Sequence, residues 1–224
     1  MGIKMSSENQ IEIAFPLKGE WQLLCPPGHH PFAFDFVKLD DNRKKYSSCS
    51  KFKLFISHIP VNKYYCWEYP IHSPIDGTVI QVGNGWKDHE KTNIWKTITL
   101  WYNATYKFKP KEINGRLDIR PNVGNYIMIQ AEQGYVVLLA HLRNTSIKVN
   151  EGQQLKSGDL IGNIGNSGNS TMPHLHINIF DQMNDPLSAK VLPFVFYEYK
   201  ELNNETKWEK HSLSVPKVKS FIKI

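Results

Sequence analysis

Short apolar runs separated by turn residues recur along the chain. The segment "HPFAFDFVKL" alternates large and small apolar positions, and four later runs are rich in branched residues: "GTVIQVG", "NYIMIQA", "YVVLLAHL" and "LHINIF". Gly, Asn or Pro bounds each run, as is typical of strands. No stretch has a long helical period, so we expect helices to be few and short. The pattern predicts a mostly β protein.

Two stretches interrupt this pattern and are predicted to be insertions into a sheet. Residues 41–70 are polar and aromatic, whereas residues 84–122 contain possible strands in "WKTITLWYN" and end in turn-rich sequence. The Lys- and Glu-rich tail is expected to pack loosely or to form a small appendage. The predicted organisation is a lead-in strand (1–27), one β domain with both insertions (28–193) and a C-terminal appendage (194–224).

Glycines recur at turn-like intervals just before the run "HLHINIF". They are Gly152, Gly158, Gly162, Gly165 and Gly168. Because glycine takes positive φ without steric penalty, this spacing suits tight reversals between very short strands. The segment is predicted to form a compact β-roll that leads directly into that strand.

Charge and composition narrow the classes of function. The 224 residues include 27 Lys and Arg against 21 Asp and Glu, but the basic residues are spread along the chain, which argues against nucleic-acid binding. No apolar run approaches the ~20 residues of a membrane-spanning helix. The start, "MGIKMSSENQ", has no apolar signal segment, so the protein stays inside the cell or a leader has been removed. We expect a monomer.

Two histidines open the last predicted strand. Residues i and i+2 of a strand project from one face, about 6.5–7 Å apart along the chain. His174 and His176 therefore point the same way and could grip a metal ion, or supply one ligand and one acid/base group. The simpler alternative is a pair of surface histidines on an edge strand.

Asp35 lies inside an otherwise apolar predicted strand. A carboxylate there is costly to bury unless it is paired or ligates a cation. His29 and His30 precede it, and strand parity favours His29 if the segment is extended throughout, whereas a turn near Pro31 would reverse that choice. Histidine nitrogen and carboxylate oxygen are ordinary zinc ligands, and three protein ligands leave a fourth position for water. The alternative for Asp35 is a salt bridge to a lysine.

His141 ends the apolar run "YVVLLAHL". A lone histidine there is usually structural, but beside a zinc site it would serve as a general acid/base or a transition-state stabiliser. The other histidines have no comparable context and are assigned to surface or packing roles: His58, His72, His89 and His211.

These segments together resemble the lysostaphin-type zinc endopeptidases, bacterial cell-wall peptidases with a LytM-like domain. The resemblance covers residues from about 28 to 182. It rests on "HHPFAFD", "SPIDGTVIQVG", "GNYIMI", "LLAHLRN" and "VNEGQQLKSGDLIGNIGNSGNSTMPHLHINIF", in the order found in the family. It implies a single domain of antiparallel sheet and β-roll, the duplicated hybrid motif fold.

The resemblance also implies roles for individual residues. It makes Asp35 and His176 zinc ligands and places His174 and His141 beside the metal as catalytic, non-ligating groups. The family's usual first ligand lies four residues before the aspartate, where this chain has Pro31. His30 is therefore taken as the third ligand, with His29 as the alternative.

The implied activity is hydrolysis of an amide bond in a peptide cross-bridge or stem of peptidoglycan. Zinc lowers the pKa of its bound water from ~15.7 to about 7, one of the two catalytic histidines takes up the proton, and the other stabilises the oxyanion or protonates the leaving amine. A groove walled by Trp86, Trp95 and Trp101 would suit an extended peptide, although these residues could equally belong to the core.

Two other functions fit parts of the pattern. A catalytically inactive LytM-like regulator or scaffold of cell-wall enzymes would keep the fold, but inactive members lack the aspartate or the histidine pair, and both are present here. A histidine phosphocarrier of related fold would present two histidines without needing Asp35. Zinc is the one cofactor predicted.

Overall fold

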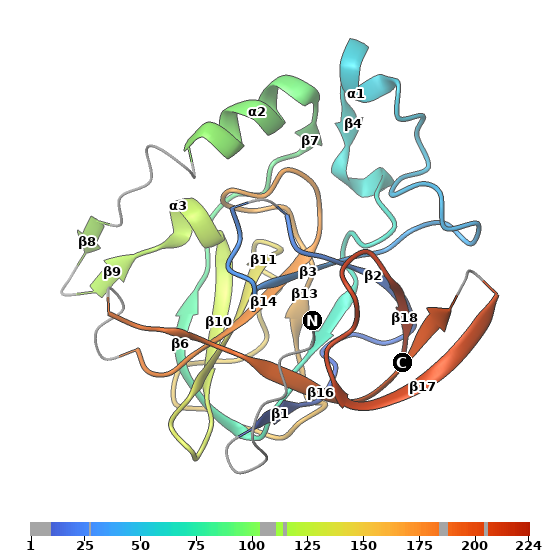
Figure 1. Ribbon diagram of the computed structural model, residues 1–224. Coiled ribbons are helices and arrows are strands. Elements are labelled where there is room, and N and C mark those ends of the chain that lie inside the picture. Colours follow the sequence, from blue (N-terminus) through green and yellow to red (C-terminus); the bar gives the residue numbers. More distant parts are fainter. Residues whose placement is uncertain (1–9, 27, 104–110, 114–115, 184–187, 204–205) are drawn as a thin grey trace.

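A large antiparallel sheet dominates the molecule (Figure 1). The computed structural model describes residues 10–26, 28–103, 111–113, 116–183, 188–203 and 206–224. Along the sheet the strands follow the order β1 (Ile11–Ile13), β16 (Phe194–Asn203), β18 (Phe221–Lys223), β2 (Glu20–Leu24), β3 (Phe34–Val37), β14 (Leu175–Phe180), β11 (Val136–Leu142), β10 (Asn125–Gln130), β6 (Gly77–Gly83) and β12 (Gln154–Leu155). β15 (Val191–Leu192) pairs with β14, and β17 (Lys207–Ser214) pairs with β16. The pair β1 and β16 is parallel.

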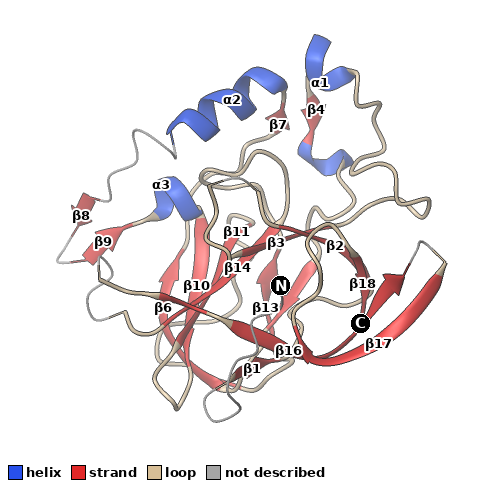
Figure 2. Ribbon diagram, viewed as in Figure 1, coloured by secondary structure: helices blue, strands red, loops and turns tan. Residues whose placement is uncertain are grey.

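Small ladders and short helices complete the described structure (Figure 2). The ladders pair β5 (Pro70–His72) with β13 (Leu160–Asn163), β4 (Ile59–Pro60) with β7 (Lys91–Thr92), and β8 (Lys111–Ile113) with β9 (Arg116–Asp118). The helices are α1 (Lys53–Ile56), η1 (Val61–Lys63), α2 (Ile94–Tyr102) and α3 (Arg120–Val123). The predicted mostly β fold class, with few and short helices, is confirmed.

The five apolar runs are strands, as the sequence predicts. They form β3, β6, β10, β11 and β14. Alternate residues of β11 face two separate apolar clusters: Leu139 packs into the larger cluster and Leu138 into a smaller one with Met128. A strand buried on both faces has no polar alternation, which explains the unbroken "VVLLA".

The segment "WKTITLWYN" is a helix, and its prediction as possible strands is wrong. Asn93 caps α2, because its side-chain oxygen accepts a hydrogen bond from Lys96 N at 2.8 Å. The hydroxyls of Thr97 and Thr99 donate to carbonyls one turn earlier, so these β-branched residues are accommodated in a helix. Trp95 is exposed on α2, Trp86 is partly buried, and the side chain of Trp101 lies outside the described residues.

The C-terminal tail does not pack loosely. Phe194, Phe196 and Tyr199 of β16 are buried in the main core, and Ile222 of β18 is fully buried beside them. β18 lies between β16 and β2, so the sheet runs without a break from the tail to the strand that pairs with β3. Glu198 and Lys200 of β16 are exposed, and the Lys- and Glu-rich composition of the tail concealed this core strand.

The glycine-spaced roll leads into β14 as expected. Gly152, Gly158 and Gly168 have positive φ, and the short strands β12 and β13 lie between them.

None of the helices in the described ranges is long and apolar enough to cross a membrane.

Candidate metal centre

The register between β3 and β14 brings the aspartate and the late histidine pair together. His176 is paired with Asp35 on one side and with Ala140 of β11 on the other. His176 Nδ1 lies 2.8 Å from Asp35 Oδ1. Because β14 is an interior strand between β3 and β11, the alternative of surface histidines on an edge strand is excluded.

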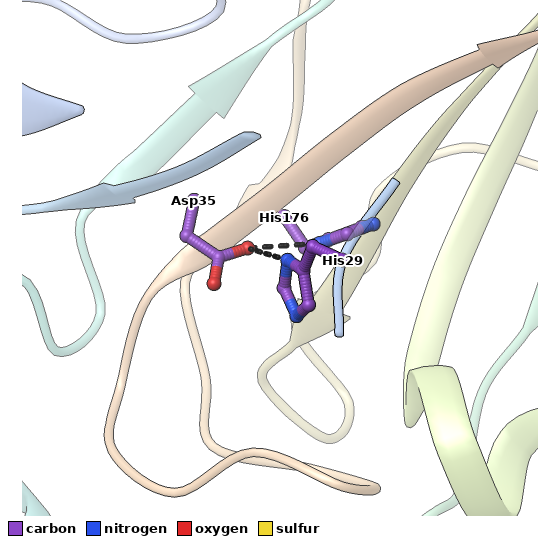
Figure 3. A group of neighbouring side chains, drawn as sticks. All are labelled: His29, Asp35 and His176. Atoms are coloured by element: carbon purple, nitrogen blue, oxygen red, sulfur yellow. Dashed lines mark hydrogen bonds and ion pairs between the residues drawn. The ribbon is translucent and has the colours of Figure 1, made fainter. Parts of the chain in front are cut away.

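His29 completes a three-residue cluster with Asp35 and His176 (Figure 3). One ligand atom from each residue lies within 4.8 Å of the others. His29 Nδ1 is 3.7 Å from Asp35 Oδ1, and its ring meets the His176 ring edge-on with centroids 5.2 Å apart. Side chains from two distant parts of the sequence therefore converge on one point.

His30 lies outside this cluster. It is exposed, its ring packs beside Phe32, and its Nδ1 accepts a hydrogen bond from Phe32 N at 3.3 Å. A turn closed by Ala33 N and His30 O separates His29 from β3, so the extended segment assumed by the parity argument is not present. Nevertheless the turn directs His29 toward Asp35. The geometry therefore favours His29, the alternative from the sequence, over the preferred His30.

His141 and His174 lie on the same side of the sheet as the cluster. His174 Nε2 is 3.6 Å from Asp35 Oδ2. The His141 ring centroid lies 4.6 Å from that of His174 and 5.9 Å from that of His176. All five residues that the sequence marks, with His29 in place of His30, thus come together.

Backbone carbonyls orient both of these rings. His141 Nδ1 lies 2.9 Å from Ser167 O, and His174 Nδ1 lies 2.7 Å from Met172 O. A carbonyl only accepts, so each Nδ1 must carry the proton and donate it. In the neutral ring the lone pair is then on Nε2, which in His174 is the nitrogen near Asp35.

A tight backbone contact between Gly124 and Gly168 lies next to Ser167, the residue that holds the His141 ring. The sequence did not predict this contact. His141 has a φ of 62°, an uncommon value for a residue with a side chain. Gly124 and Gly168, both at positive φ, pack backbone against backbone, and a Cβ on either would collide with the other loop. This contact places Ser167, the hydrogen-bond acceptor of His141. The turn-forming dipeptides Gly124-Asn125 and Ser167-Gly168 were the sequence feature that could have indicated this contact.

The pKa values of Asp35 and His141 are both shifted, for different physical reasons. Burial alone would raise the pKa of Asp35, but His174, His176 and His29 outweigh it and hold that pKa well below its usual range. The described partners of Asp35 are these histidines, rather than the lysine considered as an alternative. Burial, with smaller contributions from His174 and His176, lowers the pKa of His141 well below 6.5.

The donor set fits a zinc ion. Two imidazoles and a carboxylate are ordinary zinc ligands. His29 Nδ1 is buried and has no hydrogen-bond partner among the described residues, so a lone pair on this nitrogen would be available to a cation. Asn178 Oδ1 lies 3.2 Å from His176 Nε2 and can accept its proton, which would free Nδ1 of that ring as a ligand. These three residues could therefore hold the metal.

Hydrogen bonds connect the two insertions to the loops next to His141 and His174. Asp88 accepts hydrogen bonds from Asn166 N at 2.7 Å and Asn144 N at 2.8 Å. His89, which the sequence assigned to a surface or packing role, contacts the Gly168 carbonyl through Nε2 at 2.7 Å. The buried Cys66 thiol donates to Pro173 O, immediately before His174. The first insertion therefore contacts the site through Cys66, and the second through Asp88 and His89.

The choice between the two adjacent histidines gives a first prediction. His29→Ala should bind zinc on the order of 10²-fold more weakly or worse, because one of three protein ligands is lost. His30→Ala, the matched control one residue away, should keep its zinc. Metal titration of both purified variants measures their zinc affinity. If His30→Ala lost its zinc while His29→Ala kept it, the assignment would be reversed.

Comparisons with known proteins agree with the motif pattern. The family model described as "Peptidase family M23" matches residues 114–188, a segment that contains His141, His174 and His176. A 68-residue stretch is 38% identical to an uncharacterized metalloprotease of Buchnera aphidicola and covers 30% of this chain and 17% of that protein. A 59-residue stretch is 41% identical to the peptidoglycan DD-endopeptidase ShyA of Vibrio cholerae and covers 26% of this chain and 13% of that protein.

Among solved structures, the catalytic domain of the antimicrobial peptidase lysostaphin from Staphylococcus simulans aligns with a TM-score of 0.39 at 16% identity, over 80% of this chain and 86% of that one. The sequence matches confirm the resemblance to LytM-like M23 peptidases, with the family match confined to residues 114–188. The chain spans at most 17% of the length of these curated relatives.

Proposed function

We propose that this protein is a zinc-dependent endopeptidase that hydrolyses amide bonds in peptidoglycan-type peptides. The match to the M23 peptidase family supports a peptidase, and the likeness to a peptidoglycan DD-endopeptidase supports the substrate class. One observation carries the proposal: ligand atoms of His29, Asp35 and His176 lie within 4.8 Å of one another, with two further imidazoles on the same side.

In this proposal His29, Asp35 and His176 hold the metal. Zinc, when bound, supplies a Lewis acid for the amide carbonyl and lowers the pKa of water to about 7. Asp35 is anionic and offsets part of the charge of the cation. Its second oxygen lies 3.6 Å from His174 Nε2, where it would attract that ring once Nε2 carries a proton.

His174 and His141 are assigned the proton transfers. Each ring donates its Nδ1 proton to a backbone carbonyl, so the lone pair that can accept a proton is on Nε2. One ring takes a proton from the attacking water. The other, when protonated, donates to the oxyanion or to the leaving amine, and histidine suits both tasks because its unperturbed pKa is near 6.5.

The direct test is metal analysis together with digestion of purified cell wall. The zinc-loaded protein should carry about one zinc per chain. It should release peptide fragments with new amino groups from peptidoglycan, and chelation should stop the release. Zinc binding without hydrolysis of any wall preparation would instead support the inactive regulator, and phosphorylation by a carrier protein would support the phosphocarrier.

A further inference from the structure

Each insertion contains a helix, α1 or α2, that exposes large apolar side chains. On the turn that contains α1, Phe52, Phe55 and Ile56 are 66%, 63% and 67% exposed. On α2, Trp95 and Ile98 are 73% and 50% exposed. The spacings of three and four residues put each set on one side of its helix. Large apolar residues that gather on an exposed turn are typical of an interaction surface, whereas single scattered ones are not.

The two apolar turns belong to one structural unit. The strand β4 follows α1 and pairs with β7, which precedes α2, so Ile59 lies opposite Thr92 at their common base. Figure 2 shows α1 and α2 projecting from the same side of the body, away from the large sheet. We call the exposed side chains of Phe52, Phe55, Ile56, Trp95 and Ile98 the apolar tip.

The positive charge of the protein is concentrated in these insertions. Residues 41–70 and 84–122 contain 14 Lys and Arg against six Asp and Glu, whereas the rest of the chain contains 13 against 15. The insertions are therefore net positive by eight and the remainder is net negative by two. Lys51 and Lys53 are exposed on either side of Phe52, and Lys91 is exposed just before α2.

We propose that the apolar tip and its surrounding lysines bind the surface of an anionic lipid bilayer. Protruding aromatic and aliphatic side chains bury themselves at the boundary between headgroups and acyl chains. Lysines beside them are attracted to anionic headgroups. A lipid surface is favoured over an anionic polymer because a polymer would use the lysines but would leave five apolar side chains in water.

The proposed surface is separate from the metal cluster but connected to it. Asp88 and His89, at the start of the second insertion, bond to the loop that carries Ser167, the acceptor of His141. A bilayer bound at the apolar tip would therefore hold the catalytic histidines close to the membrane surface. This inference does not require the proposed hydrolysis, because lipid binding is measured without substrate.

Sedimentation with phosphatidylcholine vesicles, with and without about one-third phosphatidylglycerol, tests the proposal. The full chain should bind the anionic vesicles, less tightly as salt rises. Phe55→Ser and Trp95→Ser should each weaken binding by about tenfold or more, because each removes a large inserted side chain. Lys51→Gln and Lys53→Gln should each weaken it about fivefold.

Val218→Ser is the matched control, since Val218 is equally an exposed apolar residue but lies in the loop before β18. It should bind like the wild type, and all variants should keep their zinc content and thermal stability. Absence of binding to anionic vesicles, or equal binding by Trp95→Ser, overturns the proposal. A wild-type dimer that Phe55→Ser dissociates would also overturn it, because the tip would then pair two copies of the chain.

Discussion

Asp35→Asn should abolish metal binding and hydrolysis together. The substitution keeps the size of the side chain and removes its negative charge, so the cluster loses its one anionic ligand while His29 and His176 remain. We expect the zinc content to fall from about one to below about 0.1 per chain, and peptide hydrolysis to fall by a factor on the order of 10³ or more. Metal analysis and a peptidoglycan release assay measure the two effects on the same sample.

The folded structure should survive this change. Removing one member of a buried ion pair is damaging when it leaves an uncompensated charge, but the neighbouring imidazoles can lose their protons and become neutral. Asp41→Asn is the matched control, an exposed aspartate in the loop after β3, and should keep zinc and activity. An Asp35→Asn protein that retains stoichiometric zinc would show that the metal is held elsewhere or not at all.

His174→Ala and His141→Ala should separate catalysis from metal binding. Neither residue belongs to the cluster of His29, Asp35 and His176, so each variant should keep about one zinc per chain. Hydrolysis should fall by about 10²–10⁴-fold in each, the usual contribution of a positioned acid or base. The double variant should lose little more than the worse single variant, because the effects of residues that act together as one catalytic unit are not additive.

One experimental result would contradict the assignment of His174 to catalysis rather than to metal binding. His174 Nε2 lies 3.6 Å from Asp35, close enough that the ring itself could approach the metal. If His174→Ala is isolated without zinc and cannot be reloaded, His174 is a ligand and the proposed assignment is wrong. His58→Ala, an exposed histidine in the first insertion, controls for the loss of any imidazole and should match the wild type in both measurements.

Local sequence patterns predicted the strands of the site well because neighbouring residues determine them. The branched apolar runs bounded by Gly and Asn became β10, β11 and β14, and the parity of "HLH" placed His174 and His176 together. The sequence patterns gave a wrong prediction where the intrinsic preference of the residues was outweighed by other local interactions. The threonines of α2 favoured a strand, but the Asn93 cap stabilises a helix there, and the threonine hydroxyls are satisfied by carbonyls one turn earlier.

The sequence alone determined which chemical groups are available, their order along the chain, the mostly β architecture and the family resemblance. Tertiary structure decided which groups meet. Asp35 and His176 are 141 residues apart and come into contact through the register of β3 against β14. The turn at Pro31 decided that His29 rather than His30 faces the cluster, and strand pairing placed the tail within the sheet. These outcomes depend on packing between distant segments, which no pattern of adjacent residues encodes.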